Sequence, residues 1–191
     1  MSTSAERAIA AIASPAASAT SALSWITRLD EEIFLRVGAL RPRWLVRLMR
    51  SLTHLGDPTG WVAIGLFLGC AGPQGPRRAL LLGAGALLAT LLSQFLKRWC
   101  RRPRPSAGLL QFVALVENPD AFSFPSGHTS AAFAVAVALS GQGAGLGPLS
   151  LGLACAIGFS RIYLGAHYPL DVMTGALLGC IAGGAARILF L

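Results

Sequence analysis

The sequence predicts an all-α fold, an integral membrane helical bundle of five to six transmembrane helices, on three observations. Hydrophobic residues make up 54% of the 191 residues, whereas charged residues make up only 13%. The mean hydropathy of the chain is +0.62, which is high for a soluble protein of this size. The apolar residues also collect in runs that approach or reach the length of a bilayer crossing, with polar or glycine-rich breaks between them.

The N-terminal part of the chain is less apolar than the rest. Residues 1–24 are rich in Ala and Ser, and they lack the basic start and Leu-rich centre of a signal peptide. We expect a poorly ordered tail here, with room for one short interfacial helix, before a single membrane-embedded domain over residues 25–191. Residues 29–50 alternate apolar positions with arginines and include Pro42. They either lie in the membrane interface with their arginines snorkelling or make a sixth crossing.

Five segments further along are apolar enough to be spans: residues 61–72, 79–96, 129–140, 148–164 and 170–191. The second is the clearest by length and apolarity. The last carries glycines at four-residue spacing: Gly175, Gly179 and Gly183. Such a stripe of small residues lets neighbouring helices approach closely.

The charge balance narrows the classes of partner. The chain has 16 Lys and Arg against 8 Asp and Glu, a net charge of +8. This excess suits anionic lipid headgroups or a phosphate substrate, and nucleic acid is the weakest interpretation because the basic residues do not interleave with aromatic ones. The four cysteines have neither metal-ligand nor disulfide-framework spacing. We therefore expect a membrane protein with no nucleic-acid partner, no metal site and no cofactor.

Three polar clusters lie between the spans. The first, "KRWCRRPRP", starts at Lys97 and follows a span directly. The second, "FSFPSGHTS", places residues 126–129 at a helix N-terminus, where backbone N–H groups favour an anion. The third, "SRIYLGAHYPLD", contains His167 and Asp171 four residues apart, so the carboxylate can reach back to the imidazole. Taken singly, these clusters are also explained as membrane-flanking charges, an ordinary helix start and a surface ion pair.

The predicted topology brings all three clusters to one face of the membrane. One site could then hold three cations (Lys97, Arg104 and Arg161), two histidines, one carboxylate and a helix N-terminus. Cations around an anion site suit phosphate, and two histidines suit phosphoryl transfer through a covalent intermediate. These residues alone leave open which histidine attacks.

The spacing of these residues resembles a known signature. Its three blocks are Lys97-x6-Arg104-Pro105, Pro125-Ser126-Gly127-His128 and Ser160-Arg161-x5-His167-x3-Asp171. Together they resemble the type 2 phosphatidic acid phosphatase superfamily, which includes membrane lipid phosphate phosphatases and the soluble vanadium haloperoxidases. No signature position departs from the pattern.

The resemblance implies a role for each residue. It makes His167 the nucleophile, oriented by Asp171, and His128 the acid that protonates the leaving oxygen and then activates water. Lys97, Arg104 and Arg161 would hold the phosphate oxygens, with help from Ser126 and the Gly127 backbone N–H. His54 and Asp57 are interpreted as a turn near the catalytic side. Arg98, Arg101 and Arg102 are interpreted as headgroup-facing or topological charges.

The implied function is hydrolysis of a lipid phosphate or diphosphate in the cell membrane, without a metal. Polyprenyl (di)phosphates, phosphatidic acid and phosphatidylglycerophosphate all remain candidates. The alternatives are a vanadate-dependent haloperoxidase and a non-catalytic lipid-phosphate-binding or transport protein. With six helices we expect an outward-facing site, whereas an interfacial segment over residues 29–50 would favour the cytoplasm. The sequence predicts no particular oligomeric state.

Overall fold

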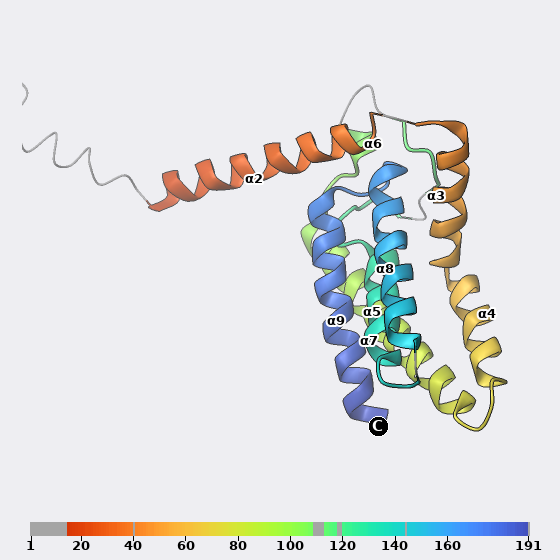
Figure 1. The fold of residues 1–191 in the computed structure, drawn as a ribbon. Coiled ribbons are helices and arrows are strands. Elements are labelled where there is room, and N and C mark those ends of the chain that lie inside the picture. Colours follow the sequence, from red (N-terminus) through yellow and green to blue (C-terminus); the bar gives the residue numbers. More distant parts are fainter. Residues whose placement is uncertain (1–14, 40, 109–112, 118–119, 144, 191) are drawn as a thin grey trace, which may run out of the picture.

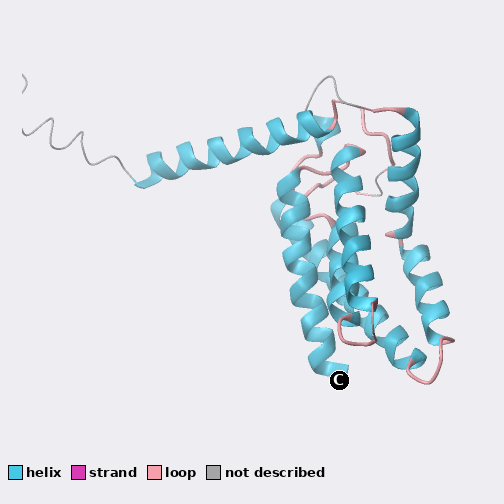
Figure 2. Cartoon of the chain, in the orientation of Figure 1, coloured by secondary structure: helices cyan, strands magenta, loops and turns pink. Residues whose placement is uncertain are grey.

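The structure, a computed structural model, describes residues 15–39, 41–108, 113–117, 120–143 and 145–190. These residues form an all-helical protein without a named β-strand (Figures 1 and 2), which confirms the predicted fold class. The helices are α2 (Pro15–Val37), α3 (Arg43–Leu55), α4 (Pro58–Gly69), α5 (Gly75–Cys100), α6 (Pro105–Gly108), α7 (Gly127–Leu139), α8 (Leu146–Tyr163) and α9 (Pro169–Phe190).

The five predicted apolar segments correspond to α4, α5, α7, α8 and α9. Over the described residues, α5, α8 and α9 are long and apolar enough to cross a membrane, whereas α4 and α7 are shorter apolar helices. Their outer faces carry exposed apolar side chains at helical spacing, such as Leu87, Leu91 and Phe95 on α5. Such faces are suited to contact with lipid tails, so the chain is a membrane protein.

The N-terminal region differs from the expectation in two respects. The expected tail boundary at residue 24 falls inside α2, which begins at Pro15, and residues 1–14 lie outside the described residues. Residues 29–50 do not form one helix, because α2 ends at Val37 and α3 begins at Arg43 after Pro42. Proline has no backbone N–H and cannot continue a helix from the preceding turn. Neither α2 nor α3 is among the helices that could span a membrane.

Helix α7 lies at the centre of the bundle and contacts α5, α8 and α9. The glycine stripe of α9 faces it at very short range. A Cβ atom at Gly179 would collide with the Ser130 carbonyl oxygen, and one at Gly183 would collide with the Ala134 carbonyl oxygen. Only glycine permits this approach of two helix backbones.

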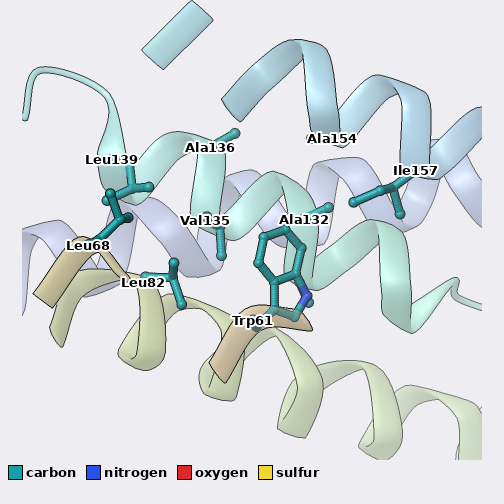
Figure 3. Packing of buried hydrophobic residues seen from close by; sticks show 10 residues of the cluster. Trp61, Leu68, Leu82, Ala132, Val135, Ala136, Leu139, Ala154 and Ile157 are labelled. Atoms are coloured by element: carbon teal, nitrogen blue, oxygen red, sulfur yellow. The ribbon is translucent and has the colours of Figure 1, made fainter. Parts of the chain in front are cut away.

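The largest buried cluster joins α4, α5, α7 and α8 (Figure 3). Trp61 of α4 packs with Leu82 of α5 and with the alanines and Val135 of α7, and Ile157 of α8 closes the other side. The small side chains of α7 leave room for the large ones on its neighbours. This packing fixes the beginning of α7 relative to the other helices.

The helix directions decide where a site can lie. Helices α5 and α8 end, and α7 and α9 begin, at the same end of the bundle, and the C-terminus lies at the opposite end (Figure 1). The loops that carry the three polar clusters therefore meet at one end, hereafter the site end.

Candidate active site

Two cations of the site are joined by one carboxylate. Lys97 lies in the last turn of α5, and Arg104 follows once Arg101 has ended the helix in a left-handed conformation (φ 48°). Lys97 Nζ donates to Asp120 Oδ2 over 2.6 Å, and Arg104 Nη2 donates to Asp120 Oδ1 over 2.5 Å. Burial raises the pKa of Asp120, but the hydrogen bonds and charges of Lys97 and Arg104 hold it below its ordinary value. Asp120 is therefore an anion at neutral pH, held by the two cations predicted to bind phosphate.

The third cation, Arg161, lies in the last turn of α8 and is 2% exposed. Its Nη1 donates to the Thr53 hydroxyl over 2.6 Å. Thr53 is a buried residue of α3. Helix α3 thus forms part of the wall of the site.

His167 lies in the connection between α8 and α9 and is 1% exposed. Its Nδ1 is 2.7 Å from the Ser123 carbonyl oxygen, which can only accept, so Nδ1 carries the ring proton. The other nitrogen, Nε2, is then unprotonated and lies 3.4 Å from Arg104 Nη1. Burial, followed by the charges of Arg161, Arg104 and Lys97, lowers the pKa of His167 well below its ordinary value. The result is a neutral imidazole with its lone pair near a cation.

Asp171 lies near His167 without a hydrogen bond to it. The distance from His167 Nδ1 to Asp171 Oδ2 is 3.8 Å. Oδ2 instead accepts from the Tyr168 backbone N–H at 2.9 Å, and Oδ1 accepts from Arg102 Nη1 at 2.7 Å. Asp171 is the third residue of α9, where a carboxylate can reach back to the backbone N–H at the helix start. The expected direct contact is thus replaced by a contact with the neighbouring backbone.

His128 is the second residue of α7 and has its own carboxylate partner. Its Nε2 is 2.7 Å from Asp57 Oδ1, and Asp57 Oδ2 is 2.9 Å from His54 Nδ1. Asp57 precedes α4, whose first residue is Pro58. Burial raises the pKa of Asp57, but its hydrogen bonds and charge interactions with His54 and His128 hold it below its ordinary value. The carboxylate is therefore ionised between two imidazoles.

The start of α7 contains Ser126 and Gly127, which the resemblance implies as phosphate-binding residues. Ser126 is the N-cap residue, fully buried, and its hydroxyl accepts from the Thr129 hydroxyl over 2.9 Å. The Ser126 backbone N–H donates to the Asp171 carbonyl oxygen over 2.9 Å, which ties α7 to the first turn of α9. Gly127 follows, with a free first-turn N–H expected at any helix start.

An apolar groove of about 710 Å³ leads away from these groups. At the site end it is lined by Lys97, Asp120, Gly127 and His128, and at its far end by Gly69, Cys70 and Ala79. Between them, side chains of α4 and α5 such as Val62, Leu66 and Leu87 form its walls. The apolar channel therefore reaches two signature residues, Lys97 and His128, at the site end. Among the described residues, no three His, Cys, Asp or Glu side chains are placed to hold a metal ion.

The comparisons with known proteins agree with this geometry. The model of one family, described as the PAP2 superfamily, matches residues 78–190, which is more than half of the chain. The chain belongs to the PAP2 superfamily. The match covers all three signature blocks, so the resemblance in the sequence is confirmed.

Relatives of this PAP2 protein include named phosphatases. The decaprenylphosphoryl-5-phosphoribose phosphatase of Mycobacterium tuberculosis is 38% identical over 135 residues, 70% of this chain and 74% of the relative. The crystal structure of Aquifex aeolicus LpxE superposes with a TM-score of 0.72 at 33% identity, covering 83% of this chain and 94% of that one. A PAP2-type phosphatidylglycerolphosphate phosphatase from Bacillus subtilis gives a TM-score of 0.69 at 27% identity, covering 94% and 89%.

Some residues of this PAP2 site have no signal in the signature. Four groups outside the three blocks each contact a signature residue: Asp57, Asp120, Thr53 and the Ser123 carbonyl. Asp57 had a partial signal, since it stands before an apolar segment that starts on the catalytic side. Arg102 is not a headgroup-facing charge, because it bridges two buried carboxylates, Asp30 and Asp171.

Proposed function

We propose that this PAP2 protein hydrolyses a membrane lipid phosphate or diphosphate through a phosphohistidine intermediate, without a metal. Its relatives are named phosphatases, and the protein is an enzyme of the same class, a lipid phosphate phosphatase. The observation that supports the substrate class is the apolar groove that reaches Lys97 and His128 at the site end. A substrate with an anionic head and a long apolar tail matches both parts.

The geometry supports His167 as the nucleophile. The Nε2 lone pair attacks phosphorus, a P–N bond forms, and the bond to the lipid oxygen breaks. Three buried cations (Lys97, Arg104 and Arg161) stabilise the negative charge on the phosphoryl oxygens in this step. Asp120 accepts one side-chain hydrogen bond from each of Lys97 and Arg104, so it competes with those oxygens for the two cations.

His128 supplies and removes the proton. As the imidazolium, it donates a proton to the leaving lipid oxygen; as the neutral base, it accepts one from the water that attacks the phosphohistidine. The P–N bond then breaks and its electron pair returns to His167 Nε2. Asp57 binds His128 Nε2, so His128 Nδ1 is the nitrogen left for the substrate. An ionised carboxylate at this position also stabilises the imidazolium.

The candidate substrates are the lipids named for the relatives and other lipids with a phosphate head and a long apolar tail. Polyprenyl phosphates and diphosphates, phosphatidic acid and phosphatidylglycerophosphate each combine a phosphate head with a tail that the groove accommodates. The relatives act on a decaprenyl-linked phosphoribose and on phosphatidylglycerolphosphate, judged by their names. These two lipids therefore enter any substrate panel first.

We also propose which side of the membrane the site faces. The outward orientation expected from the sequence rests on a sixth crossing by residues 29–50, and neither α2 nor α3 is a candidate span. Without that crossing, the exposed arginines of α2 and α3 join those that follow α5 at the site end, and few remain at the other end, where Arg77, Arg78 and Arg187 lie. The positive-inside rule then supports a site that faces the cytoplasm of the cell.

The deciding experiment is phosphate release by purified protein in detergent with EDTA. The panel contains dioleoyl phosphatidic acid, phosphatidylglycerophosphate, a decaprenyl monophosphate, a decaprenyl diphosphate and decaprenylphosphoryl-5-phosphoribose. We expect release from at least one lipid, and a fall in kcat of at least about a thousandfold in His167→Ala. Elution volume and thermal midpoint check that the variant is folded.

Other outcomes would replace the proposal. Wild-type turnover in His167→Ala would remove the nucleophile assignment, and loss of activity in EDTA would indicate metal-dependent chemistry. Halide oxidation in the presence of vanadate would indicate a haloperoxidase. Tight binding of lipid phosphate without any release would indicate a binding or transport protein.

A further inference from the structure

Helix α2 has a buried face and, beside it, an exposed apolar one. On the buried face, Phe34 is fully buried and Asp30 is 2% exposed. The neighbouring arc carries apolar side chains that are between 39% and 63% exposed: Trp25, Ile26, Leu29 and Ile33. At 100° per residue, Arg28 and Glu32 lie on the opposite side of the helix together with the exposed Leu35, and Arg36 lies at the border, between Trp25 and Leu29.

This arrangement suits a helix that lies flat in the lipid headgroup layer. Helix α2 leaves the bundle at the site end and runs crosswise to the bundle helices (Figure 1). An apolar arc next to the bundle, with charges on the far side, places the arc in the acyl boundary and the charges in water. The arginines among those charges add attraction to anionic lipids.

The buried face of α2 reaches the residues behind His167. Asp30 Oδ1 accepts from the Leu170 backbone N–H over 2.8 Å, and Asp30 Oδ2 accepts from Arg102 Nη2 over 2.6 Å. The other guanidinium nitrogen, Arg102 Nη1, donates to Asp171 Oδ1 over 2.7 Å. The side chains of Asp30 and Asp171 are both 0% exposed. One guanidinium therefore links α2 to the carboxylate that sits beside the nucleophile.

A second set of contacts holds the residue next to His167. The Arg102 guanidinium carbon lies 4.2 Å from the centre of the Tyr168 ring, within the range of a cation–π contact. The Phe34 ring of α2 packs on the Tyr168 ring with 5.4 Å between centroids. Both contacts fix the residue whose backbone N–H binds Asp171.

Loss of the Asp30 charge would disturb this arrangement from one end. In Asp30→Asn one of the two oxygens becomes an NH2 donor, so either the Leu170 N–H or one arm of the Arg102 guanidinium loses its acceptor and faces a donor instead. Of the two carboxylates, only Asp171 would then hold Arg102 through an ion pair. Because Asp171 also binds the Tyr168 backbone, a shift of Arg102 displaces the segment that carries His167.

We propose that α2 is an interfacial strap: its exposed arc binds the lipid headgroup layer, and Asp30 on its buried face is a positioning residue for Arg102, Asp171 and the His167 segment. The contact of α2 with the bilayer is then linked to the positions of Arg102, Asp171 and the His167 segment in the phosphate-binding site. By thermodynamic reciprocity, an anion bound in the site must in turn stabilise α2 against the bundle. The kinetic part of this inference rests on the proposed function, whereas the exchange measurements below do not.

The first test compares Asp30→Asn with Glu32→Gln. Both remove one carboxylate charge from α2, but Glu32 is exposed and, within the described part of the chain, its ion pair is with Arg36 on the same helix. With dioleoyl phosphatidic acid or the best lipid of the panel, we expect kcat of Asp30→Asn to fall between about tenfold and a hundredfold, as misplacement of a reacting group does. KM should change little, and Asp30→Glu should recover part of kcat. Equal kcat values in the Asn and Gln variants would overturn the positioning role.

The second test needs no turnover. Hydrogen exchange of residues 24–37 is measured in phosphatidylglycerol-containing nanodiscs, with and without orthovanadate as the anion probe. We expect orthovanadate to slow α2 exchange about fivefold or more in the wild type and in Glu32→Gln, but not in Asp30→Asn. Orthovanadate that binds without any effect on wild-type α2 would contradict the link.

A third variant tests the lipid contact and covers the case in which Asp30→Asn does not fold. Ile26→Ser with Leu29→Ser changes only the exposed arc, and Glu32→Ser is its matched control on the charged side. We expect α2 exchange in nanodiscs to rise in the arc variant alone. Unchanged α2 exchange in the arc variant would exclude the headgroup layer as the partner of α2.

If orthovanadate does not bind at all, the proposed function fails, but the positioning role can still be tested. Faster exchange of residues 164–172 in Asp30→Asn than in Glu32→Gln supports that role. Equal exchange of this segment in the two variants overturns it.

Discussion

The two histidines of the site are held by opposite ring nitrogens. His167 uses Nδ1 to bind the Ser123 carbonyl, which leaves Nε2 unprotonated, and His128 uses Nε2 to bind Asp57. The Ser123 carbonyl fixes the tautomer of His167, while burial and the charges of Arg161, Arg104 and Lys97 lower the pKa of that ring and keep it neutral. The ionised Asp57 carboxylate instead favours the protonated ring of His128. These partners suit a nucleophile and an acid, respectively. The chemical division between the two rings thus follows from their surroundings, of which the hydrogen-bond partners are one part.

Replacement of Asp57 tests this division. Asp57→Asn keeps the shape of the side chain but removes the charge that stabilises the His128 imidazolium, so we expect kcat to fall by about a hundredfold, the lower range for general acid–base catalysis. His54→Gln serves as the control, since it leaves the bond between Asp57 and His128 in place. Stopped-flow measurement of lipid release would register the change. An Asn variant with wild-type kcat would show that Asp57 does not assist His128.

Burial of His167 also makes stability depend on pH. The pKa of His167 lies well below its ordinary 6.5 in the folded protein, so below pH 6.5 the unfolded chain binds a proton that the folded one does not. Stability is full above that pH and is lost as the pH falls towards the folded pKa, at no more than about 1.4 kcal/mol per pH unit. Thermal midpoints in detergent at pH 7.5 and 5.5 should therefore differ more for the wild type than for His167→Gln. Equal differences would exclude this linkage.

The residues that the sequence predicted, and those it did not, differ in the range of their contacts. Lys97, Arg104 and His167 were predicted from fixed spacings, each within its own block, and the helix directions then bring the blocks together. The partner of His167 Nδ1 is a backbone carbonyl, which every residue possesses and no side-chain pattern marks. The i,i+4 spacing predicted a contact of Asp171 with His167, but a nearer backbone N–H at the helix start took its place.

At the scale of the elements, apolar runs predicted the helices within a few residues. The predicted span over residues 148–164 is α8, Leu146–Tyr163, and the last span begins at Pro169, one residue earlier than expected. The structure of residues 29–50 was harder to predict from the sequence, because the arginines in this segment suit both an interfacial helix and a weak span. The position of α2 depends on contacts of Asp30 with residues 72 and 140 positions away in the chain, which no local pattern indicates.

Because the backbones of α7 and α9 approach closely, we expect a larger side chain at Gly179 to lower the stability of the protein strongly. Gly179→Val would press a branched side chain into the Ser130 carbonyl and Phe133 of α7, so we expect a loss of stability of about 3 kcal/mol or more. Gly184→Ala is the matched control on the same helix, because nothing lies within 4 Å of a Cβ atom there. Thermal unfolding in detergent compares the two. Similar midpoints for both variants would mean that the helices are not in backbone contact.

At the scale of the whole molecule, the orientation of the protein in the membrane can be tested by labelling two native cysteines. Cys100 lies at the site end and Cys70 at the opposite end, and both are exposed. A membrane-impermeant maleimide added to intact cells should label a variant that retains only Cys70, and a variant that retains only Cys100 should be labelled after the membrane is opened. The reverse pattern would place the site on the outer face.

The groove between α4 and α5 sets a limit on how the protein can discriminate among lipids. Its lining extends along α5 from Lys97 to Ala79, which are eighteen positions apart, or about 27 Å of helix, close to the thickness of the hydrocarbon core. A tail longer than this must emerge at the far end and mix with bulk lipid, where further carbons meet the same surroundings before and after binding. Chain length beyond that point therefore contributes nothing to affinity. Selectivity among long-tailed substrates is left to the first few atoms around the phosphate.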